Sequence, residues 1–318
     1  ESNWKKLTTH TPNFNSVIVI GGVSMQPQIR DLKRNPRLVI ATPGRLCDHI
    51  NRRTINMSKM HALVLDEADR MLDMGFAPDL NAIVRHLPKE RHTLFFTATW
   101  DSNLDKLTKS YLKNPERIVI GTPSKTVDTV EQTVLSVNGA DKNDLLLDLL
   151  NAHQGSVLVF TRTKHRTDRV AKYLNSFGMD VSRIHGGRSQ AQRTAALADF
   201  RSGKSRVLVA TDIAARGIDV ANIAQIINYD IPKSPEDYVH RIGRTGRAGR
   251  SGEAISLVAP DEEKLLKSIE RMTKQKIADG DLLDFTVFKR SHDARKVRVE
   301  LLLVYIVDCK LKNEAALL

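Results

Sequence analysis

The sequence predicts an α/β protein built of two parallel-sheet domains in tandem. Short apolar runs rich in β-branched residues alternate with longer segments of helical periodicity along most of the 318 residues. Strands that alternate with helices are typical of βαβ units, in which the strands lie parallel. A chain of this length suits two domains of ordinary size. The pattern weakens at residues 121–128 (GTPSKTVD), where Gly, Pro and small polar residues predict a linker.

We therefore divide the chain into a first domain, residues 1–121, a linker, 122–128, a second domain, 129–275, and a C-terminal tail, 276–318. The strands expected in the first domain are Val17–Ile20, Leu38–Ala41, Ala62–Leu65, Leu94–Thr97 and Ile118–Ile120. Those expected in the second are Val157–Phe160, Val181–Ile184, Val207–Ala210, Ile226–Tyr229 and Ala254–Val258. The helical segments include Ser102–Leu112, Lys142–Asn151, His165–Phe177, Ser189–Arg201 and Asp261–Lys274.

The charge balance indicates a polyanionic partner. There are 49 Lys and Arg against 37 Asp and Glu, a formal net charge of +12, which favours nucleic acid or anionic lipid. A generally basic, solubilising surface is the alternative. The two cysteines, Cys47 and Cys309, lie in no metal-binding or disulfide pattern, so we expect a cytoplasmic protein. No apolar run approaches the roughly 18–20 residues that span a bilayer, so we expect no membrane association.

An acidic pair follows one of the predicted buried strands. Asp66 and Glu67 begin the tetrapeptide D-E-A-D directly after Ala62–Leu65. The carboxyl ends of strands in an α/β sheet form the ligand crevice, and two carboxylates there suit Mg²⁺. The alternative is the solvated first turn of a helix, where acids are common.

Two further strand ends in the first half carry groups that suit phosphate binding or hydrogen-bond relay. Thr42-Pro-Gly-Arg45 closes a strand and opens a helix, with Thr42 as a candidate N-cap and Pro43 at the first helical position. A helix N-terminus beside an arginine is a ready phosphate site. Gly21-Gly22 follows the first strand as a turn that a phosphate could approach. Thr97 and Thr99 place two hydroxyls at another strand end, where they either relay hydrogen bonds or cap the next helix.

The second half contains an arginine-rich repeat, His240-Arg-Ile-Gly-Arg-Thr-Gly-Arg247. Its arginines recur every third residue, and arginine forks bind phosphate oxygens and stabilise charge on a transferring phosphoryl group. A basic, solvated helix is the alternative. The interleaved Gly243 and Gly246 argue against it, because each weakens a helix by about 1 kcal/mol.

Other strand ends in the second half also combine hydroxyl, acid and arginine side chains. Thr211-Asp-Ile-Ala-Ala-Arg-Gly-Ile-Asp219 follows one buried strand, and Val159-Phe-Thr-Arg-Thr163 ends another. Gln190 and Arg193 lie on one face of the helix after Gly186-Gly187.

Taken in order, these motifs resemble the DEAD-box family of ATP-dependent RNA helicases. The resemblance runs from about Val17 to Met272, and the sequence in and around the motifs is most similar to that of bacterial members. It implies two RecA-like domains, ATP and Mg²⁺ as cofactors, and RNA as a partner held by its backbone without base preference. It also implies nucleotide-driven domain closure that unwinds or remodels short duplexes.

The resemblance assigns roles residue by residue. Asp66 and Glu67 would hold Mg²⁺, and Glu67 would activate the attacking water. Thr97, where the family more often has Ser, and Thr99 would couple ATP to RNA. Gly217 and Asp219 would contact the nucleotide, Arg244 and Arg247 would reach the γ-phosphate, and His240 and Arg241 would tie their motif to the first domain. The RNA contacts would be Gly22, Thr42, Pro43, Gly44, Arg45, Arg162, Thr163, Gln190, Arg193, Thr211, Asp212 and Arg216.

Three of the family's motifs are not found in the sequence before Asp66. They are the phosphate-cradling loop G-x-x-x-x-G-K-[ST], the segment with the adenine-recognition glutamine, and P-T-R-E-L. We therefore expect a first domain truncated at its N-terminal side, with exposed apolar strand edges and lower stability than the second. Two hypotheses follow, an RNA helicase whose sequence is incomplete and an inactive RNA-binding remnant. A DNA-unwinding enzyme is a third, disfavoured by D-E-A-D with T-P-G-R. We expect a monomer whose tail can bind protein partners.

Overall fold

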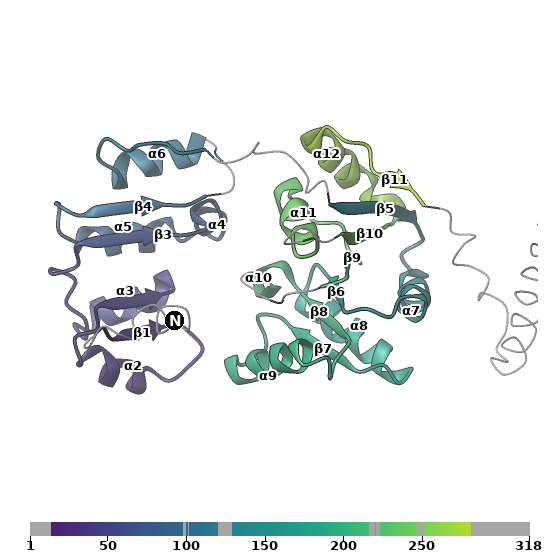
Figure 1. Ribbon diagram of the computed structural model, residues 1–318, viewed down its shortest axis with the longest axis horizontal. Helices are drawn as coiled ribbons and strands as arrows, with labels where there is room; N and C mark the ends of the chain where they lie inside the picture. Colours follow the sequence, from purple (N-terminus) through teal and green to yellow (C-terminus); the bar gives the residue numbers. More distant parts are fainter. Residues whose placement is uncertain are drawn as a thin grey trace, which may run out of the picture. The chain divides into compact units, whose positions relative to one another are not determined.

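The computed structural model describes residues 14–97, 100, 102–119, 129–215, 220, 223–246 and 251–280, with the backbone alone at 102, 103 and 106. The chain divides into two compact units, one made mainly of residues before 126 and one made mainly of residues from 126 onward. Both units combine parallel strands with helices (Figure 1). The α/β class predicted from the sequence is therefore confirmed.

The first unit contains two separate pairs of parallel strands in its described residues. Strand β1 (Ser16–Val19) pairs with β2 (Leu38–Ala41), and β3 (Ala62–Leu65) pairs with β4 (His92–Phe95). Helices follow the strands along the chain: α2 (Met25–Leu32), α3 (Pro43–Asn51), α4 (Ala68–Asp73), α5 (Ala77–Arg85) and α6 (Ser102–Tyr111).

Strand β1 shows how the first unit builds its core. Val17 and Val19 are buried, whereas Ile18 between them is 38% exposed. Alternate residues of a strand point to opposite faces, so only one face of this strand is covered. Apolar side chains on the other strands are exposed in the same way: Ile40, Val64 and Leu94. Parallel sheets are normally covered on both faces. Exposed apolar strand surface was expected in this domain, and the structure contains it.

The second unit is built on a seven-stranded sheet whose described strand pairs are all parallel. The strand order is β11-β5-β10-β9-β6-β8-β7. The bounds are β5 (Val130–Ser136), β6 (Val157–Phe160), β7 (Val181–Ile184), β8 (Val207–Ala210), β9 (Gln225–Asn228), β10 (Gly252–Val258) and β11 (Ala278–Asp279). The helices are α7 (Lys142–Ala152), α8 (Lys164–Ser176), α9 (Gln190–Arg201), α10 (Asp212–Ala215), α11 (Pro235–Ile242) and α12 (Glu263–Thr273), with a 3₁₀ turn, η1 (Pro260–Glu262).

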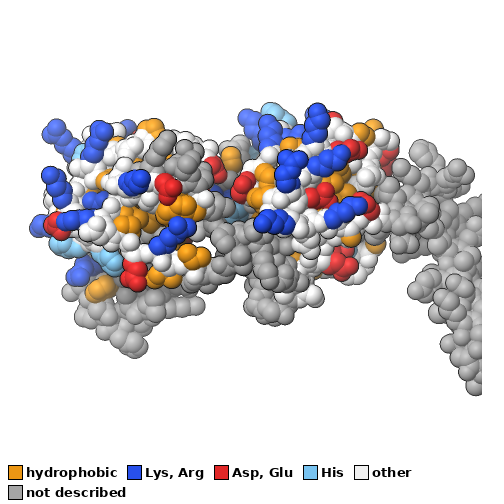
Figure 2. Space-filling view, turned by 90° about the horizontal axis from the view of Figure 1, so that it is seen from above, with side chains coloured by type: hydrophobic (Ala, Val, Ile, Leu, Met, Phe, Trp, Pro, Cys, Tyr) orange, Lys and Arg blue, Asp and Glu red, His pale blue; other side chains and the backbone are white. Residues whose placement is uncertain are grey.

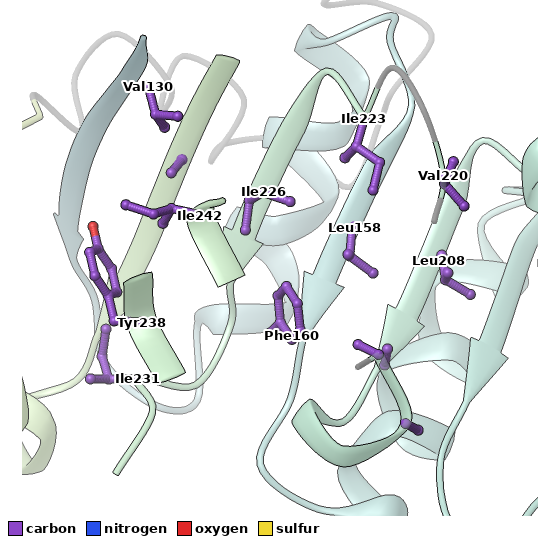
Figure 3. Close-up of a cluster of buried hydrophobic side chains, with 14 of the residues drawn as sticks. Val130, Leu158, Phe160, Leu208, Val220, Ile223, Ile226, Ile231, Tyr238 and Ile242 are labelled. Carbon is purple, nitrogen blue, oxygen red and sulfur yellow. The ribbon is translucent and has the colours of Figure 1, made fainter. Parts of the chain in front are cut away.

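Two apolar clusters sandwich this sheet. Leu158 and Phe160 of β6 pack into one cluster with Ile226 and Tyr238 (Figure 3). Val157 and Val159 of the same strand belong to the other cluster, which includes residues of α7 and α8. Every residue of β6 is therefore buried, as expected for a central strand of a parallel sheet. The well-covered core fixes the ends of β6 and β8, where two of the polar motifs lie.

One predicted strand is wrong, and two described strands, β5 and β11, were not predicted. Residues 118 and 119 form no strand and pair with no strand of the described part of the chain, and Ile118 is 78% exposed. Ile120 lies outside the described residues. Strand β5 was missed because its sequence, VEQTVLS, is half polar. The linker predicted at 122–128 also lies outside the described residues. The sheet of the second unit continues through β11, beyond residue 275, where the sequence analysis ends this domain.

In the part of the chain that the structure describes, no helix combines the length and hydropathy that crossing a membrane requires.

Candidate functional site

The acidic pair lies at the carboxyl end of β3, as predicted. Asp66 and Glu67 are both exposed, and the chain turns at Glu67, whose φ of 49° lies in the left-handed region. Such backbone is uncommon for a residue other than glycine and concentrates at functional sites. The Oδ1 atom of Asp66 accepts the N–H of Glu67 at 3.0 Å. The turn therefore presents two carboxylates at the edge of the sheet.

Backbone hydrogen bonds join this turn to the end of β4. Phe96 N–H donates to Leu65 O at 2.8 Å, and Ala68 N–H donates to Phe96 O at 3.1 Å. These bonds extend the parallel pairing past both strands, so the next residue, Thr97, lies at the same edge as Asp66 and Glu67. The structure thus brings together three of the predicted catalytic residues. Thr99 lies outside the described residues.

The turn after β1 is fastened to the start of α3. Helix α3 begins at Pro43, and the extended Thr42 before it occupies the N-cap position without a side-chain capping bond. Arg45 Nη1 donates to Val23 O at 3.0 Å, across the turn that contains Gly22 at a φ of 78°. The Arg45 side chain is only 13% exposed. Its guanidinium therefore positions the Gly-Gly turn in this structure.

A buried polar network beneath this turn was not predicted. Gln28 Nε2 donates to Ile20 O at 3.1 Å and to Ser24 O at 3.2 Å, and its Oε1 lies 3.4 Å from His49 Nε2. His49 is fully buried, and its Nδ1 is 2.7 Å from Thr54 Oγ1. Burial lowers the pKa of His49 below its ordinary value of 6.5, with the Arg45 charge adding to the effect. A neutral His49 thus suits this site.

In the second unit, the segment after β6 is held by charged groups. Arg162 N–H donates to Asp230 Oδ2 at 2.8 Å, and Arg162 Nη2 donates to Glu262 Oε1 at 2.7 Å. Glu262 is buried and also binds Lys142 Nζ. Thr163 caps α8 by accepting the N–H of Arg166 at 3.2 Å. The backbone carrying the Thr-Arg-Thr motif is therefore rigidly placed.

Arg241 is held by hydrogen bonds from all three of its guanidinium nitrogens. Its Nε and Nη2 atoms donate to the two carboxylate oxygens of Asp212, at 2.5 and 2.8 Å. Its Nη1 donates to Asn228 Oδ1 at 3.0 Å and to Asp230 O at 2.7 Å, and the guanidinium stacks 4.9 Å from the Phe160 ring centroid. Only 2% of this side chain is exposed. Arg241 therefore joins two of the second unit's own motifs.

The glycines of the arginine repeat have structural causes. Helix α11 ends at Ile242, so Arg241 is helical and Arg244 lies in the turn that follows. Gly246 has a φ of 65°, and a Cβ there would come within 2.7 Å of Val130 Cγ2. The absence of a side chain at Gly246 thus allows this turn to lie close to strand β5. Thr245 Oγ1 donates to Ile223 O at 2.6 Å, which anchors the same turn.

Two family models match the sequence. "DEAD/DEAH box helicase" covers residues 1–107, and "Helicase conserved C-terminal domain" covers residues 141–249. The DEAD-box ATP-dependent RNA helicase CshA of Bacillus subtilis is 43% identical over 260 residues, 81% of this chain and 53% of the relative. The ATP-dependent rRNA helicase RRP3 of Kluyveromyces lactis is 46% identical over 265 residues, 82% and 54% of the two chains. The chain thus spans about half the length of these curated relatives.

Solved structures agree with this match. S. cerevisiae Dbp5 bound to RNA and ADP BeF3 has a TM-score of 0.79 and 31% identity, covering 88% of this chain and 74% of that one. The chain belongs to the DEAD-box helicase family. Mss116p bound to ssRNA and AMP-PNP also shares the fold, with a TM-score of 0.76 and 26% identity, covering 88% and 61% of the two chains. The predicted tandem RecA-like architecture is confirmed. The bacterial and yeast relatives have similar sequence identities to this chain, so these comparisons do not identify it as a bacterial-type member.

The remaining predicted DEAD-box residues divide into placed and undescribed ones. Thr211 directly precedes α10, and its carbonyl accepts the N–H of Ala215 at 2.9 Å. Gln190 opens α9, and the Arg193 side chain one turn later has a buried Nε with no hydrogen-bond partner among the described residues. His240 lies on α11, and Gly44 lies in the first turn of α3. Arg216, Gly217, Asp219 and Arg247 lie outside the described residues.

The acidic pair suits a cation that is shared with a ligand. Among the described residues, no cluster of three or more His, Cys, Asp or Glu side chains could hold a metal alone. Mg²⁺ is commonly bound by one or two carboxylates together with substrate phosphates and water. The two exposed carboxylates of Asp66 and Glu67 fit that incomplete donor set.

Proposed function

We propose that this protein is an RNA-stimulated ATP hydrolase that separates or remodels short RNA duplexes. The observation that carries the proposal is the turn at Asp66 and Glu67, joined by backbone hydrogen bonds to the strand end that carries Thr97. Two exposed carboxylates beside a hydroxyl at the carboxyl edge of a parallel sheet suit phosphoryl transfer. Membership of the DEAD-box family supports the same chemistry.

In the proposed reaction, water attacks the γ-phosphorus of ATP, and the bond between that phosphorus and the ADP oxygen breaks. Glu67 takes the proton of the attacking water. Asp66 holds Mg²⁺, directly or through water; the ion, when bound, neutralises charge on the phosphates. Thr97 relays the state of this site through hydrogen bonds. The exposed, left-handed turn leaves both carboxylates accessible for these roles.

The arginines of the second unit complete the proposed site. Arg244, in the turn after α11, and Arg247 would approach the γ-phosphate when the units close around ATP. Such arginine fingers are worth on the order of 10³–10⁵ in rate. Buried Arg241 supports this role by fixing the helix that precedes the turn. Closure is thereby coupled to hydrolysis.

RNA would be held by its phosphates. Figure 2 shows Lys and Arg side chains on the visible surface of each unit, and the net charge is +12. The start of α3, with Thr42 and Gly44, and the start of α9, with Gln190, supply helix N-termini that suit phosphate. Contacts of this kind do not read bases, so we expect little sequence preference. We further propose a cytoplasmic monomer whose tail, residues 276–318, binds protein partners.

The test is ATP turnover of the purified protein with and without single-stranded RNA. We expect RNA to stimulate turnover, and Glu67→Gln to lower it by about 10³ without weakening RNA binding. Glu90→Gln, at an exposed carboxylate outside the site, is the matched control and should turn over normally. RNA binding without any ATP turnover would instead identify an inactive RNA-binding remnant. Equal turnover by wild type and Glu67→Gln would refute the assigned role of Glu67.

A further inference from the structure

A groove in the second unit is not accounted for by the proposed site. It has a volume of about 750 Å³ and lies between α8 and β7, lined by residues that are mostly charged: Asp168, Arg169, Lys172, Arg183, His185 and Arg188. A second hollow of about 370 Å³ shares Asn175, Arg183, Arg188 and Gln192 with the first and continues to α9. Strand β7 is the edge of the seven-stranded sheet (Figure 1). The two hollows therefore form one groove along a free sheet edge, which we name the β7 groove.

The β7 groove has an excess of unneutralised positive charge. Arg183 Nε and His185 Nε2 both lie 3.1 Å from Asp168 Oδ1, so the acid at the floor is already engaged. In the second hollow, Asp199 pairs with Lys204 at 3.3 Å. Within the described residues no carboxylate pairs with Arg169, Lys172 or Arg188. The groove therefore has three cations available for an external anion.

The wall of the groove is held in place by His185, which is buried. The N–H of Gly187 donates to His185 Nδ1 at 3.2 Å, which leaves the proton on Nε2 for the bond to Asp168. This chain of bonds fixes the short loop that carries Arg188. The Nε of Arg188 is buried with no hydrogen-bond partner among the described residues. A buried guanidinium N–H without a partner favours an acceptor that comes from a ligand.

The groove faces away from the predicted RNA contacts on the same helix. Gln192 and Asp199 of α9 line it, whereas Gln190 and Arg193 project from the other side at 100° per residue. A helix is about 10 Å across, so an RNA chain held at Gln190 can reach the groove only with nucleotides that flank the held segment. A bound peptide strand would need apolar pockets for alternate side chains, and the lining here is charged.

We propose that the β7 groove binds backbone phosphates of RNA that flanks the strand contacted by Gln190 and Arg193. Arg169 and Lys172 supply exposed cations, and Arg188 supplies a positioned guanidinium fork. This inference rests on the proposed RNA-binding function and adds a second contact region to it. It predicts that longer RNAs bind more tightly because their flanking nucleotides also contact the β7 groove, which lies outside the DEAD-box motifs.

The experiment compares oligouridylates of increasing length by fluorescence anisotropy. The variant is Arg169→Gln/Lys172→Gln, and the matched control is Lys264→Gln/Lys267→Gln, two exposed lysines of α12. We expect the groove variant to bind the shortest RNA normally and long RNA about tenfold more weakly. On long RNA, the plot of log affinity against log salt should become shallower: the magnitude of its slope should decrease by about 1.4, or roughly 0.7 per lost phosphate contact. The control should match the wild type at every length.

The outcomes separate this inference from the proposed function. If wild type binds no RNA, the proposed function fails. If wild type binds RNA and the groove variant matches it at every length, only the groove assignment fails. An equal loss on short and long RNA would also overturn it, because the groove would not then contact flanking nucleotides. Displacement of long RNA from wild type by polyglutamate at equal charge concentration would identify an unspecific anion surface and overturn it as well.

Discussion

Arg241 and Asp212 form a doubly hydrogen-bonded ion pair inside the second unit, with both guanidinium–carboxylate bonds at 2.8 Å or less. The Arg241 side chain is 2% exposed, and that of Asp212 is 24% exposed. The pair joins the start of α10 to the end of α11, and these are the elements that carry the strand-end motif and the arginine repeat. The two motifs, joined by a pair of residues 29 positions apart, are thereby kept in one arrangement.

The pair predicts a large stability effect. Arg241→Met should lower the free energy of unfolding of the second unit by about 3–5 kcal/mol, because it leaves the partly buried Asp212 without its cation. Urea unfolding followed by tyrosine near-ultraviolet circular dichroism measures this. Lys267→Ala, at an exposed position of α12, should change it by less than about 0.5 kcal/mol. An Arg241 variant as stable as that control would mean that the pair contributes little.

The buried Glu262 predicts a second effect of this kind. Glu262→Gln removes the charge that pairs with Lys142 and Arg162. The Lys142 side chain is 3% exposed, and its Nζ also donates to the carbonyls of Tyr229 and Leu257. We expect the second unit to lose about 3–5 kcal/mol. The double variant Lys142→Met/Glu262→Leu should recover part of this, since it removes the buried Lys142 charge and leaves only the partly exposed Arg162 without its carboxylate. Urea denaturation of the two variants side by side checks it, and equal stability of both would contradict the prediction.

Sequence reasoning found the elements whose signal is local. Fully buried strands such as β6 and β8 read as continuous apolar runs, so their bounds were predicted correctly. Strand β5 was not found, because alternating polar residues conceal a strand whose burial depends on β10 and β11. The run predicted at Ile118–Ile120 has strand composition, but no described strand pairs with residues 118 and 119, and composition alone cannot supply a partner.

The residues of the candidate site likewise include some that the sequence predicts and some that it does not. The acidic pair and the arginine repeat were found because each motif is contiguous and follows a strand or helix end. Gln28, His49 and Glu262 were missed, because their partners lie up to 120 residues away in the sequence. A polar residue at an apolar helical position, such as His49 in α3, was the available signal. It identifies burial but not the partner.

His49 makes the stability of the first unit depend on pH. Burial holds its pKa below 6.5 in the folded unit, so the unfolded chain binds more protons as the pH falls below about 6.5. This contribution to stability is therefore complete above about pH 6.5 and is lost as the pH falls toward the folded pKa. Urea midpoints followed by tryptophan fluorescence measure it, because Trp4 and Trp100 both precede residue 126.

We expect the midpoint of the first unit to fall between pH 7.5 and pH 5.5, and His49→Gln to reduce that fall. His61→Gln, at an exposed histidine of the same unit, should leave it unchanged. If the two variants depend on pH equally, another group is responsible.

Cys47 should react slowly with alkylating reagents in the folded protein. Burial and the nearby Asp79 carboxylate raise the pKa of its thiol from 9.0 to about 11, and its Sγ contacts Asp79 O at 3.4 Å. Because only the thiolate reacts, a rise of this size lowers the reactive fraction about 100-fold near neutral pH. Iodoacetamide labelling with mass spectrometric mapping distinguishes the peptides of Cys47 and Cys309. Labelling of Cys47 should accelerate about 100-fold in urea, and equal rates in the folded and unfolded states would show that its site in α3 does not protect the thiol.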